Sequence, residues 1–179
     1  MVELTAVTRS ALTKFEKIGI KTFSFASGSL PGYCSVTHAA DSNTAMTGIH
    51  CFSNINTGVY GNSNSWIPGK AGGFAGFRLD HSNTEYAIEG LCVSRDKTGV
   101  YKDRATDTLT FEVTTADNAN ANSDWCTVGS IKRNGVPTEL CYSFSKPINA
   151  KAVRVITNSA GTCIDELQIF AQKGNNIFS

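Results

Sequence analysis

The 179-residue sequence has few prolines, no block of like charges and no long apolar run. Its 16 Lys and Arg residues nearly balance its 15 Asp and Glu residues, so the formal net charge is +1. Without a basic stripe the chain has no electrostatic footprint for nucleic acid, and we expect no nucleic-acid partner. No apolar segment approaches the ~20 residues that a membrane-spanning helix needs.

The first residues lack the basic and apolar regions of a signal peptide. We therefore expect an excised domain, or a mature form that carries an added methionine. The length suits one domain with a sizeable core.

Common catalytic motifs are also absent. The sequence contains no His-Glu-x-x-His, no Gly-x-Ser-x-Gly and no Gly-rich phosphate loop after a strand. Glycoside hydrolysis needs two carboxylates at a defined separation, which a sequence does not supply. We expect a protein without enzyme activity.

Six cysteines are dispersed through the chain, and none forms a Cys-x-x-Cys pair or has a histidine at zinc-ligand spacing. We therefore expect no zinc or redox site. An even number of scattered cysteines in a polar chain favours disulfides and a secreted or cell-surface location. The alternative is a set of buried free thiols in an intracellular protein, and the sequence selects no pairing. The disulfide candidates are Cys34, Cys51, Cys92, Cys126, Cys141 and Cys163.

Alternating apolar and polar residues predict β-strands through most of the chain. Leu109, Phe111 and Val113 alternate with polar residues, which is the period of a half-buried strand. Strands joined by Gly-, Ser- and Asn-rich turns, with no helical pattern between them, predict an all-β antiparallel β-sandwich. The other predicted strands fall at residues 23–25, 76–80, 86–95, 125–131, 140–144, 152–157 and 163–170.

No linker divides the chain, so we expect one domain over residues 1–179. Residues 1–22 are a lead-in that forms either a short helix or a first strand. Residues 27–70 are rich in Ser, Asn, Gly and Thr, and loops of this length are usually functional or tied down by bonds. Cys34 and Cys51 lie inside this segment and can supply the tie.

Several segments, in order along the chain, resemble the coagulation-factor type C (discoidin) domains of the galactose-binding-like jelly rolls. They are residues 39–44, 90–96, 109–115, 125–129, 144–147, 152–156 and the closing Cys-Ile-Asp-Glu-Leu-Gln-Ile-Phe of 163–170. The resemblance spans residues 37–171 and implies a jelly roll with long ligand-side loops. Two departures are Ser42, where the family has Gly, and the segment 47–70, which has no counterpart.

Two adjacent carboxylates, Asp165 and Glu166, stand in the closing strand. Neighbours in a strand face opposite sides of the sheet, so one of them needs a partner in the interior or at the rim. From the residues alone, that partner is solvent at a sheet edge or the side chain of Arg154.

The resemblance implies a different partner, a structural Ca²⁺ shared with the 39–44 turn. Calcium prefers several hard oxygen ligands, which loop carbonyls and carboxylates supply. The positions carried over are Asp41, Asn43 and Glu166. The alternative is an Asx-turn at Asp41 without an ion.

The resemblance places ligands on loops at one end of the sandwich, where rigid strands present variable tips. It implies glycan recognition by a stacking aromatic and polar groups that bind hydroxyls. Structural roles are the alternatives: Trp66 caps the core, Arg95 and Asp96 pin their loop, and His50 is a surface residue. The candidate ligand-binding residues are His50, Tyr60, Asn62, Asn64, Trp66, Arg95 and Asp96.

Two functions follow. The first is an extracellular, non-catalytic module that binds carbohydrate or glycoprotein; the second is a structural or adhesion domain that contacts protein in a larger assembly. A glycan site should be concave with convergent polar groups, whereas a protein contact should be a flatter apolar patch. A membrane surface is not expected, because Lys70 is the one base near the apolar residues of the long loop.

Overall fold

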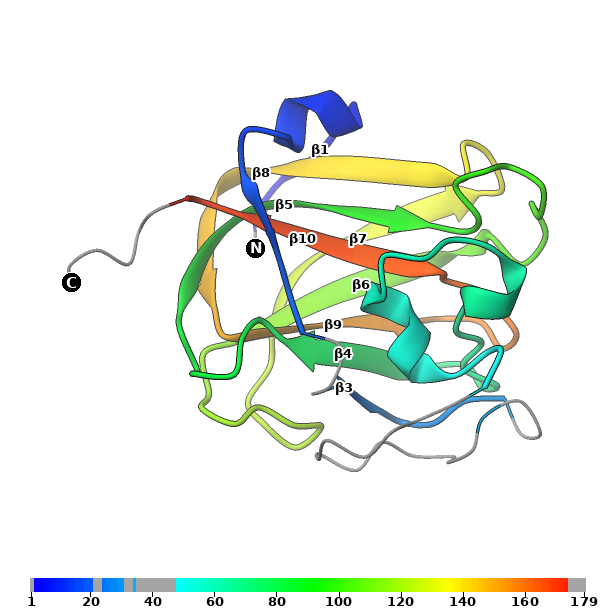
Figure 1. Ribbon diagram of the computed structural model, residues 1–179, viewed down its shortest axis with the longest axis horizontal. Coiled ribbons are helices and arrows are strands. Elements are labelled where there is room, and N and C mark those ends of the chain that lie inside the picture. The colour runs from blue at the N-terminus through cyan, green and yellow to red at the C-terminus, as the bar shows by residue number, and fades with distance from the viewer. Residues whose placement is uncertain (1, 21–23, 31–33, 35–47, 174–179) are drawn as a thin grey trace.

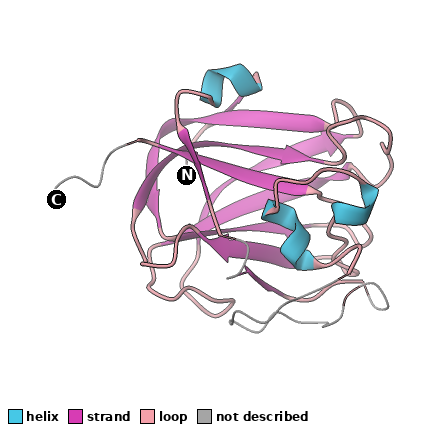
Figure 2. Cartoon of the chain, viewed as in Figure 1, coloured by secondary structure: helices cyan, strands magenta, loops and turns pink. Residues whose placement is uncertain are grey.

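The computed structural model describes residues 2–20, 24–30, 34 and 48–173, and it is a sandwich of two five-stranded antiparallel sheets (Figures 1 and 2). The first sheet runs β1 (Leu4–Val7), β8 (Glu139–Ala150), β5 (Tyr86–Ser94), β10 (Glu166–Ala171) and β2 (Glu16–Ile18). The second runs β3 (Ser24–Ala26), β4 (Phe74–Arg78), β9 (Ala152–Thr157), β6 (Thr106–Thr114) and β7 (Cys126–Asn134). The predicted all-β antiparallel sandwich is confirmed.

Short 3₁₀ helices lie in the connections: η1 (Arg9–Leu12), η3 (Phe52–Asn56) and η4 (Asn62–Asn64). The lead-in supplies edge strands as well as a short helix, since Leu4 of β1 pairs with Phe144 and Ile18 of β2 pairs with Ile169. Within the described residues no helix is long and apolar enough to cross a membrane.

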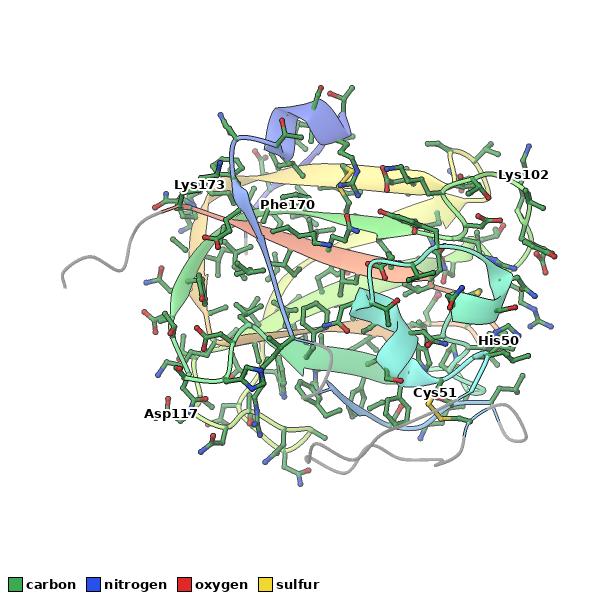
Figure 3. All side chains as sticks on the ribbon, viewed as in Figure 1. His50, Cys51, Lys102, Asp117, Phe170 and Lys173 are labelled. Atoms are coloured by element: carbon green, nitrogen blue, oxygen red, sulfur yellow. A yellow bond between two sulfur atoms is a disulfide. The ribbon has the colours of Figure 1, made fainter. Side chains whose placement is uncertain are left out.

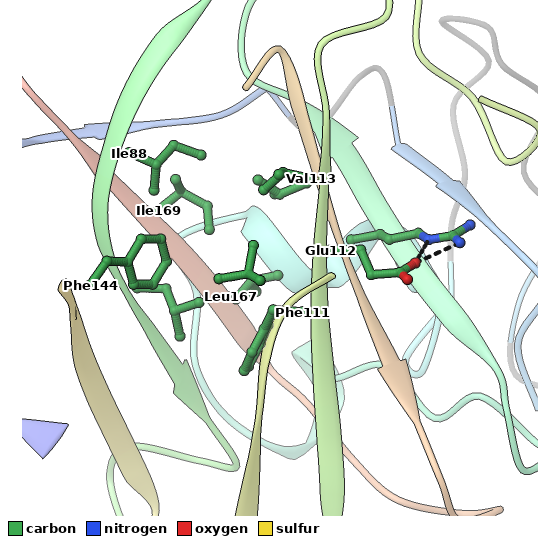
Figure 4. Close-up of a pocket in the computed structure, with 11 residues that line it drawn as sticks. Ile88, Phe111, Glu112, Val113, Phe144, Leu167 and Ile169 are labelled. Atoms are coloured by element: carbon green, nitrogen blue, oxygen red, sulfur yellow. Dashed lines mark hydrogen bonds and ion pairs between the residues drawn. The ribbon is translucent and has the colours of Figure 1, made fainter. Parts of the chain in front are cut away.

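The core lies between the two sheets. The inward side chains of β6, from Leu109 to Val113, are almost fully buried, as their alternation predicts. Figure 4 shows Ile88 and Leu167 of the first sheet facing Phe111 and Val113 of the second. The cavity left between them measures ≈ 10 Å³, about the room of one water molecule, so the sheets are closely packed.

Two disulfides join Cys34 to Cys51 and Cys92 to Cys141. The first ties the long loop, as predicted. The second links directly opposed residues of β5 and β8. The other two disulfide candidates, Cys126 and Cys163, are free.

Distance explains why the last two cysteines do not pair. Cys126 pairs in register with Val113 at the end of β6, whereas the backbone of Cys163 bonds to Arg104 just before β6 begins. The 9 residues of β6 therefore separate them, a span of about 30 Å.

The Cys92–Cys141 crosslink closes a separation of 49 residues. Replacing both cysteines with serine should lower the free energy of unfolding by about 2–4 kcal/mol, because the unfolded chain gains freedom. Urea unfolding measures the loss, and Cys126→Ser, at an exposed unpaired thiol, is the control with little effect. Alkylation of the unfolded, unreduced chain should label only Cys126 and Cys163, and label on Cys92 or Cys141 would contradict the pairing.

Candidate functional site

Several loops that are distant in sequence meet at one end of the sandwich, the right-hand end in Figure 1. Backbone hydrogen bonds hold them together: Arg95 donates to Thr138 at 2.8 Å, Cys163 to Arg104 at 2.8 Å, and Ile164 to Trp66 at 3.0 Å. These loops are residues 48–73, 95–105, 135–138 and 158–165. This end carries most of the sequence-predicted site residues.

Arg95 is the central side chain of this end, with only 1% of its surface exposed. Its Nε donates to the Asp103 carbonyl oxygen and its Nη2 donates to Asp103 Oδ1, each at 2.9 Å. Nη2 also donates to Asn62 Oδ1 at 3.3 Å. Nη1 is buried and has no hydrogen-bond partner in the part of the chain that the structure describes. Since a buried, unsatisfied charged donor is costly, this nitrogen is suited to an acceptor brought by a ligand.

His50 and Asn62 join Arg95 through Ser65. His50 Nδ1 lies 2.9 Å from Ser65 Oγ, which donates to the Asn62 carbonyl at 2.7 Å. Burial, followed by the positive charges of Arg95 and Arg104, lowers the pKa of His50. The imidazole is therefore neutral at pH 7. His50, labelled in Figure 3, is 7% exposed, so it is a buried residue and not a surface one.

Asp96 shapes the loop that follows Arg95. Its carboxylate accepts hydrogen bonds from the backbone of Thr98 at 3.1 Å and of Tyr101 at 2.9 Å. Burial opposes ionisation, but a hydrogen bond from the Thr98 hydroxyl and these two backbone bonds outweigh it and lower the pKa of Asp96. The loop presents Tyr101, which is 44% exposed and whose ring centre lies 5.6 Å from Arg95 Cζ.

Trp66 is a core residue. It is fully buried, and its Nε1 donates to the Gly28 carbonyl at 3.2 Å. The prediction that it stacks on a sugar is therefore wrong, because the ring has no exposed face. Tyr60 is also engaged elsewhere: its hydroxyl accepts from Arg9 at 3.1 Å and Gln168 at 2.9 Å. Asn64 is half-buried in η4, beside the site.

Asp165 and Glu166 are both buried, and both bind the backbone of the loop that precedes η4. Gly58 N–H donates to Glu166 Oε1 at 2.7 Å, and Gly61 N–H donates to Asp165 Oδ2 at 2.9 Å. Arg154 instead pairs with Glu112, at 2.6 Å, so the expected partnership of Arg154 with the carboxylate pair is wrong.

The other proposed calcium ligands, Asp41 and Asn43, lie outside the described residues. Across the residues that the structure describes, no group of three or more His, Cys, Asp or Glu is placed to hold a metal. The described part of the site thus supplies one carboxylate, Glu166, whose oxygens accept protein hydrogen bonds.

No family model matches the sequence, and no curated protein matches it either. Solved structures match the fold. The family 32 carbohydrate-binding module from C. perfringens NanJ, in complex with galactose, is 13% identical with a TM-score of 0.56, over 87% of this chain and 99% of that one. The module from Streptococcus pneumoniae EndoD is 13% identical with a TM-score of 0.57, over 88% and 100%. A fucolectin from striped bass serum is 9% identical with a TM-score of 0.56, over 88% and 50%.

These neighbours are discoidin-type, galactose-binding-like jelly rolls. This chain has the galactose-binding-like fold. The resemblance drawn from the residues is confirmed at the level of the fold, and the chain carries its clustered polar residues on loops at one end.

Sequence reasoning missed three residues of this end of the sandwich: Tyr101, Asp103 and Arg104. Their signal was present, because they follow Arg95 in one short loop that combines Gly99, an aromatic and a run of charges. The aromatic beside the buried guanidinium is Tyr101 rather than Trp66.

Burial raises the pKa of Glu166 to about 7 from its usual 4.5, and raises that of Asp165 as well. A carboxyl pKa that is raised in the folded state means that folding favours the protonated form. The stabilisation is fully present below the unfolded pKa and is lost as pH rises through about 7.

In metal-free buffer with chelator, the contribution of Glu166 to the unfolding free energy should therefore fall by about 3 kcal/mol between pH 5 and pH 8. Urea midpoints across this range measure the slope, and Glu166→Gln should flatten it. Asp80→Asn is the control, since the pKa of Asp80 is lowered and its contribution is lost only at acidic pH. An unchanged slope in Glu166→Gln would show that another group titrates.

Proposed function

We propose that this galactose-binding-like domain is a non-catalytic carbohydrate-binding module whose glycan docks at the loop end around Arg95. The observation that carries the proposal is the buried Nη1 of Arg95, which has no hydrogen-bond partner among the described residues. A sugar hydroxyl or ring oxygen is an acceptor of the right kind for this nitrogen. The galactose complex of a module with the same fold supports this ligand class.

Each side chain has a defined part in the proposed contact. Arg95 donates from Nη1, while Asp103 and Asn62 fix its other nitrogens. The exposed ring of Tyr101 offers an apolar face for the sugar, next to the guanidinium. His50 is neutral and holds Ser65, so it orders the loop without adding charge.

A glycan array carrying monosaccharides and oligosaccharides tests the proposal. Binding to a coherent set of sugars is expected, and Tyr101→Ala should weaken it roughly tenfold through the loss of one aromatic contact. Tyr142→Ala removes a half-buried tyrosine from β8 and should leave binding unchanged. An array without binding, or equal binding by Tyr101→Ala, would contradict the proposal.

We further propose a structural Ca²⁺ held by Asp41, Asn43 and Glu166. The support in the described residues is Asn56, whose side-chain oxygen is buried and has no hydrogen-bond partner there. Asn56 directly precedes Thr57, whose hydroxyl donates to Glu166. An amide oxygen and a carboxylate are both oxygen ligands that calcium accepts.

The thermal midpoint of unfolding should rise with added CaCl₂ in the parent chain and should not rise in Glu166→Gln. No rise in either protein would exclude the site.

The two disulfides support an extracellular or cell-surface setting, because disulfides persist in oxidising compartments. We propose this location for the domain, in keeping with glycans as its ligands.

A second function, contact with a protein partner, is favoured by a separate observation. The large apolar side chains that are exposed among the described residues all lie on loops of this same end. They are Ile49, Val59, Val100, Tyr101 and Val136, with exposures from 44% to 73%. A protein-contact role predicts that Val100→Ser and Val136→Ser abolish partner binding, whereas a glycan role predicts a larger effect from Tyr101→Ala.

A further inference from the structure

A hollow of ≈ 270 Å³ opens beside the Arg95 site, between the start of β6 and the loop that joins β9 to β10. Its lining is Arg104, Thr106, Ser159, Ala160, Gly161 and Thr162. Three hydroxyls, a guanidinium and the backbone of a turn make this lining, and Ala160 supplies its one apolar side chain. The chemistry suits a hydroxyl-rich ligand rather than an apolar one.

Arg104 forms the wall that the hollow shares with the Arg95 site. Its Nη1 donates to the Gly161 carbonyl at 2.8 Å, on the hollow's side. Its Nε lies 3.8 Å from Asp103 Oδ2, and Asp103 is the carboxylate that binds Arg95. The two guanidiniums thus share one carboxylate, and a ligand that lies across Arg104 reaches both places.

The floor of the hollow is rigid. Arg133 Nη2 donates to Thr162 Oγ1 at 2.8 Å, and its Nη1 donates to the Cys163 carbonyl at 2.9 Å. Thr162 Oγ1 also donates to the Arg104 carbonyl at 3.2 Å. Arg133 itself is buried in an ion pair with Asp107, at 2.7 Å. A shape fixed by buried, satisfied groups costs a ligand little ordering free energy.

We propose that this hollow is a second sugar subsite, so that the domain recognises an oligosaccharide of at least two units that spans Arg104. The inference rests on the proposed carbohydrate function of the Arg95 site and adds the length of the ligand. The first unit contacts Arg95 and Tyr101, and the next unit lies in the hollow, where Arg104, Ser159 and Thr106 meet its hydroxyls.

A larger hollow, of ≈ 350 Å³, provides a contrast at the other end of the sandwich. Val113, Val128, Pro147 and Ile148 line it together with polar residues, and no residue of the Arg95 site borders it. It has no continuity with the proposed first subsite, and it therefore serves as the control cavity.

The test compares monosaccharides with their linear oligosaccharides by calorimetry on the whole chain. The first probes are galactose, N-acetylgalactosamine and mannuronic acid, the sugars in complexes of similar folds, extended by any sugar found on the array. The oligosaccharide should bind at least roughly tenfold more tightly than its single unit. Ala160→Phe, which fills the hollow, should abolish this difference and leave monosaccharide affinity unchanged.

Two further variants keep the result decisive. Thr127→Phe fills the control cavity and should preserve the tenfold difference. Thr106→Gln enters the same hollow from β6 and replaces Ala160→Phe if the latter lowers the urea midpoint.

Each outcome bears on one proposal or both. Equal affinity for monosaccharide and oligosaccharide, or a difference that survives Ala160→Phe, would overturn the second subsite and leave the Arg95 site intact. Absence of binding to any glycan would remove the proposed function and the subsite together.

Discussion

Replacing Trp66 with alanine is expected to lower the free energy of unfolding by about 3–5 kcal/mol, the loss typical of a fully buried large aromatic. The side chain packs into the main core, and its Nε1 bond to Gly28 ties the beginning of the long 27–70 segment to its end. Urea unfolding at pH 7 measures the change.

Trp125→Ala is the matched control. Trp125 is half-buried and packs against Phe25, with ring centres 5.4 Å apart and the ring planes tilted by 45°. Its removal leaves a smaller gap, and the loss of stability should be clearly smaller than for Trp66→Ala. A Trp66→Ala variant with unchanged stability and abolished glycan binding would contradict the core role and show that Trp66 belongs to the binding site.

Breaking the Arg133–Asp107 pair should destabilise the domain by about 3–5 kcal/mol, because Arg133→Met leaves the Asp107 carboxylate buried without its cation. Both side chains are almost wholly buried, at 4% and 0% exposure. The Arg133→Met, Asp107→Leu double variant should recover much of the loss, since no uncompensated charge is left inside.

A double-mutant cycle on the urea midpoint measures the coupling of the pair. Lys151→Met, in the exposed pair with Asp117, is the control and should have a far smaller effect. If Arg133→Met matched this exposed control, the ion pair would not be what holds Thr162 and Cys163 in place.

The strands were the part of this fold that the sequence could predict. In β6, the alternation from Leu109 to Val113 is a local property that follows from the period of a strand. The extent of β8 was underestimated, because its second half, up to Ala150, is polar and carries no such pattern. Its pairing, with Ile148 opposite Ile88 and Ala150 opposite Tyr86, is set by a distant strand.

Trp66 shows why the candidate site was only partly predictable. An aromatic in a run of Asn, Ser and Gly has the local character of an exposed loop tip. Its burial depends on an isolated bridge to Ile164 and on the Gly28 carbonyl, contacts that span tens of residues. By contrast, Arg95, Asn62 and His50 are candidates that the sequence supplied, and the structure shows that they share one network.

The carboxylate pair gives an intermediate case. The sequence correctly required a partner for two adjacent acids in a buried strand. The donors are backbone N–H groups of Gly58 and Gly61, more than a hundred residues away. Because every residue type except proline has such a group, no sequence motif identifies these donors.

This mode of attachment bears on how the domain can diversify. Asp165 and Glu166 hold the loop through Gly58 and Gly61, which have φ values of +81° and +114° that favour glycine. The side chains of residues 59 and 62–64 take no part in these two bonds. A library that keeps the two glycines and two carboxylates while varying residues 59 and 62–64 should therefore retain the scaffold and shift its ligand preference. The main chain of this loop is fixed to the sandwich, and its remaining side chains are therefore free to vary.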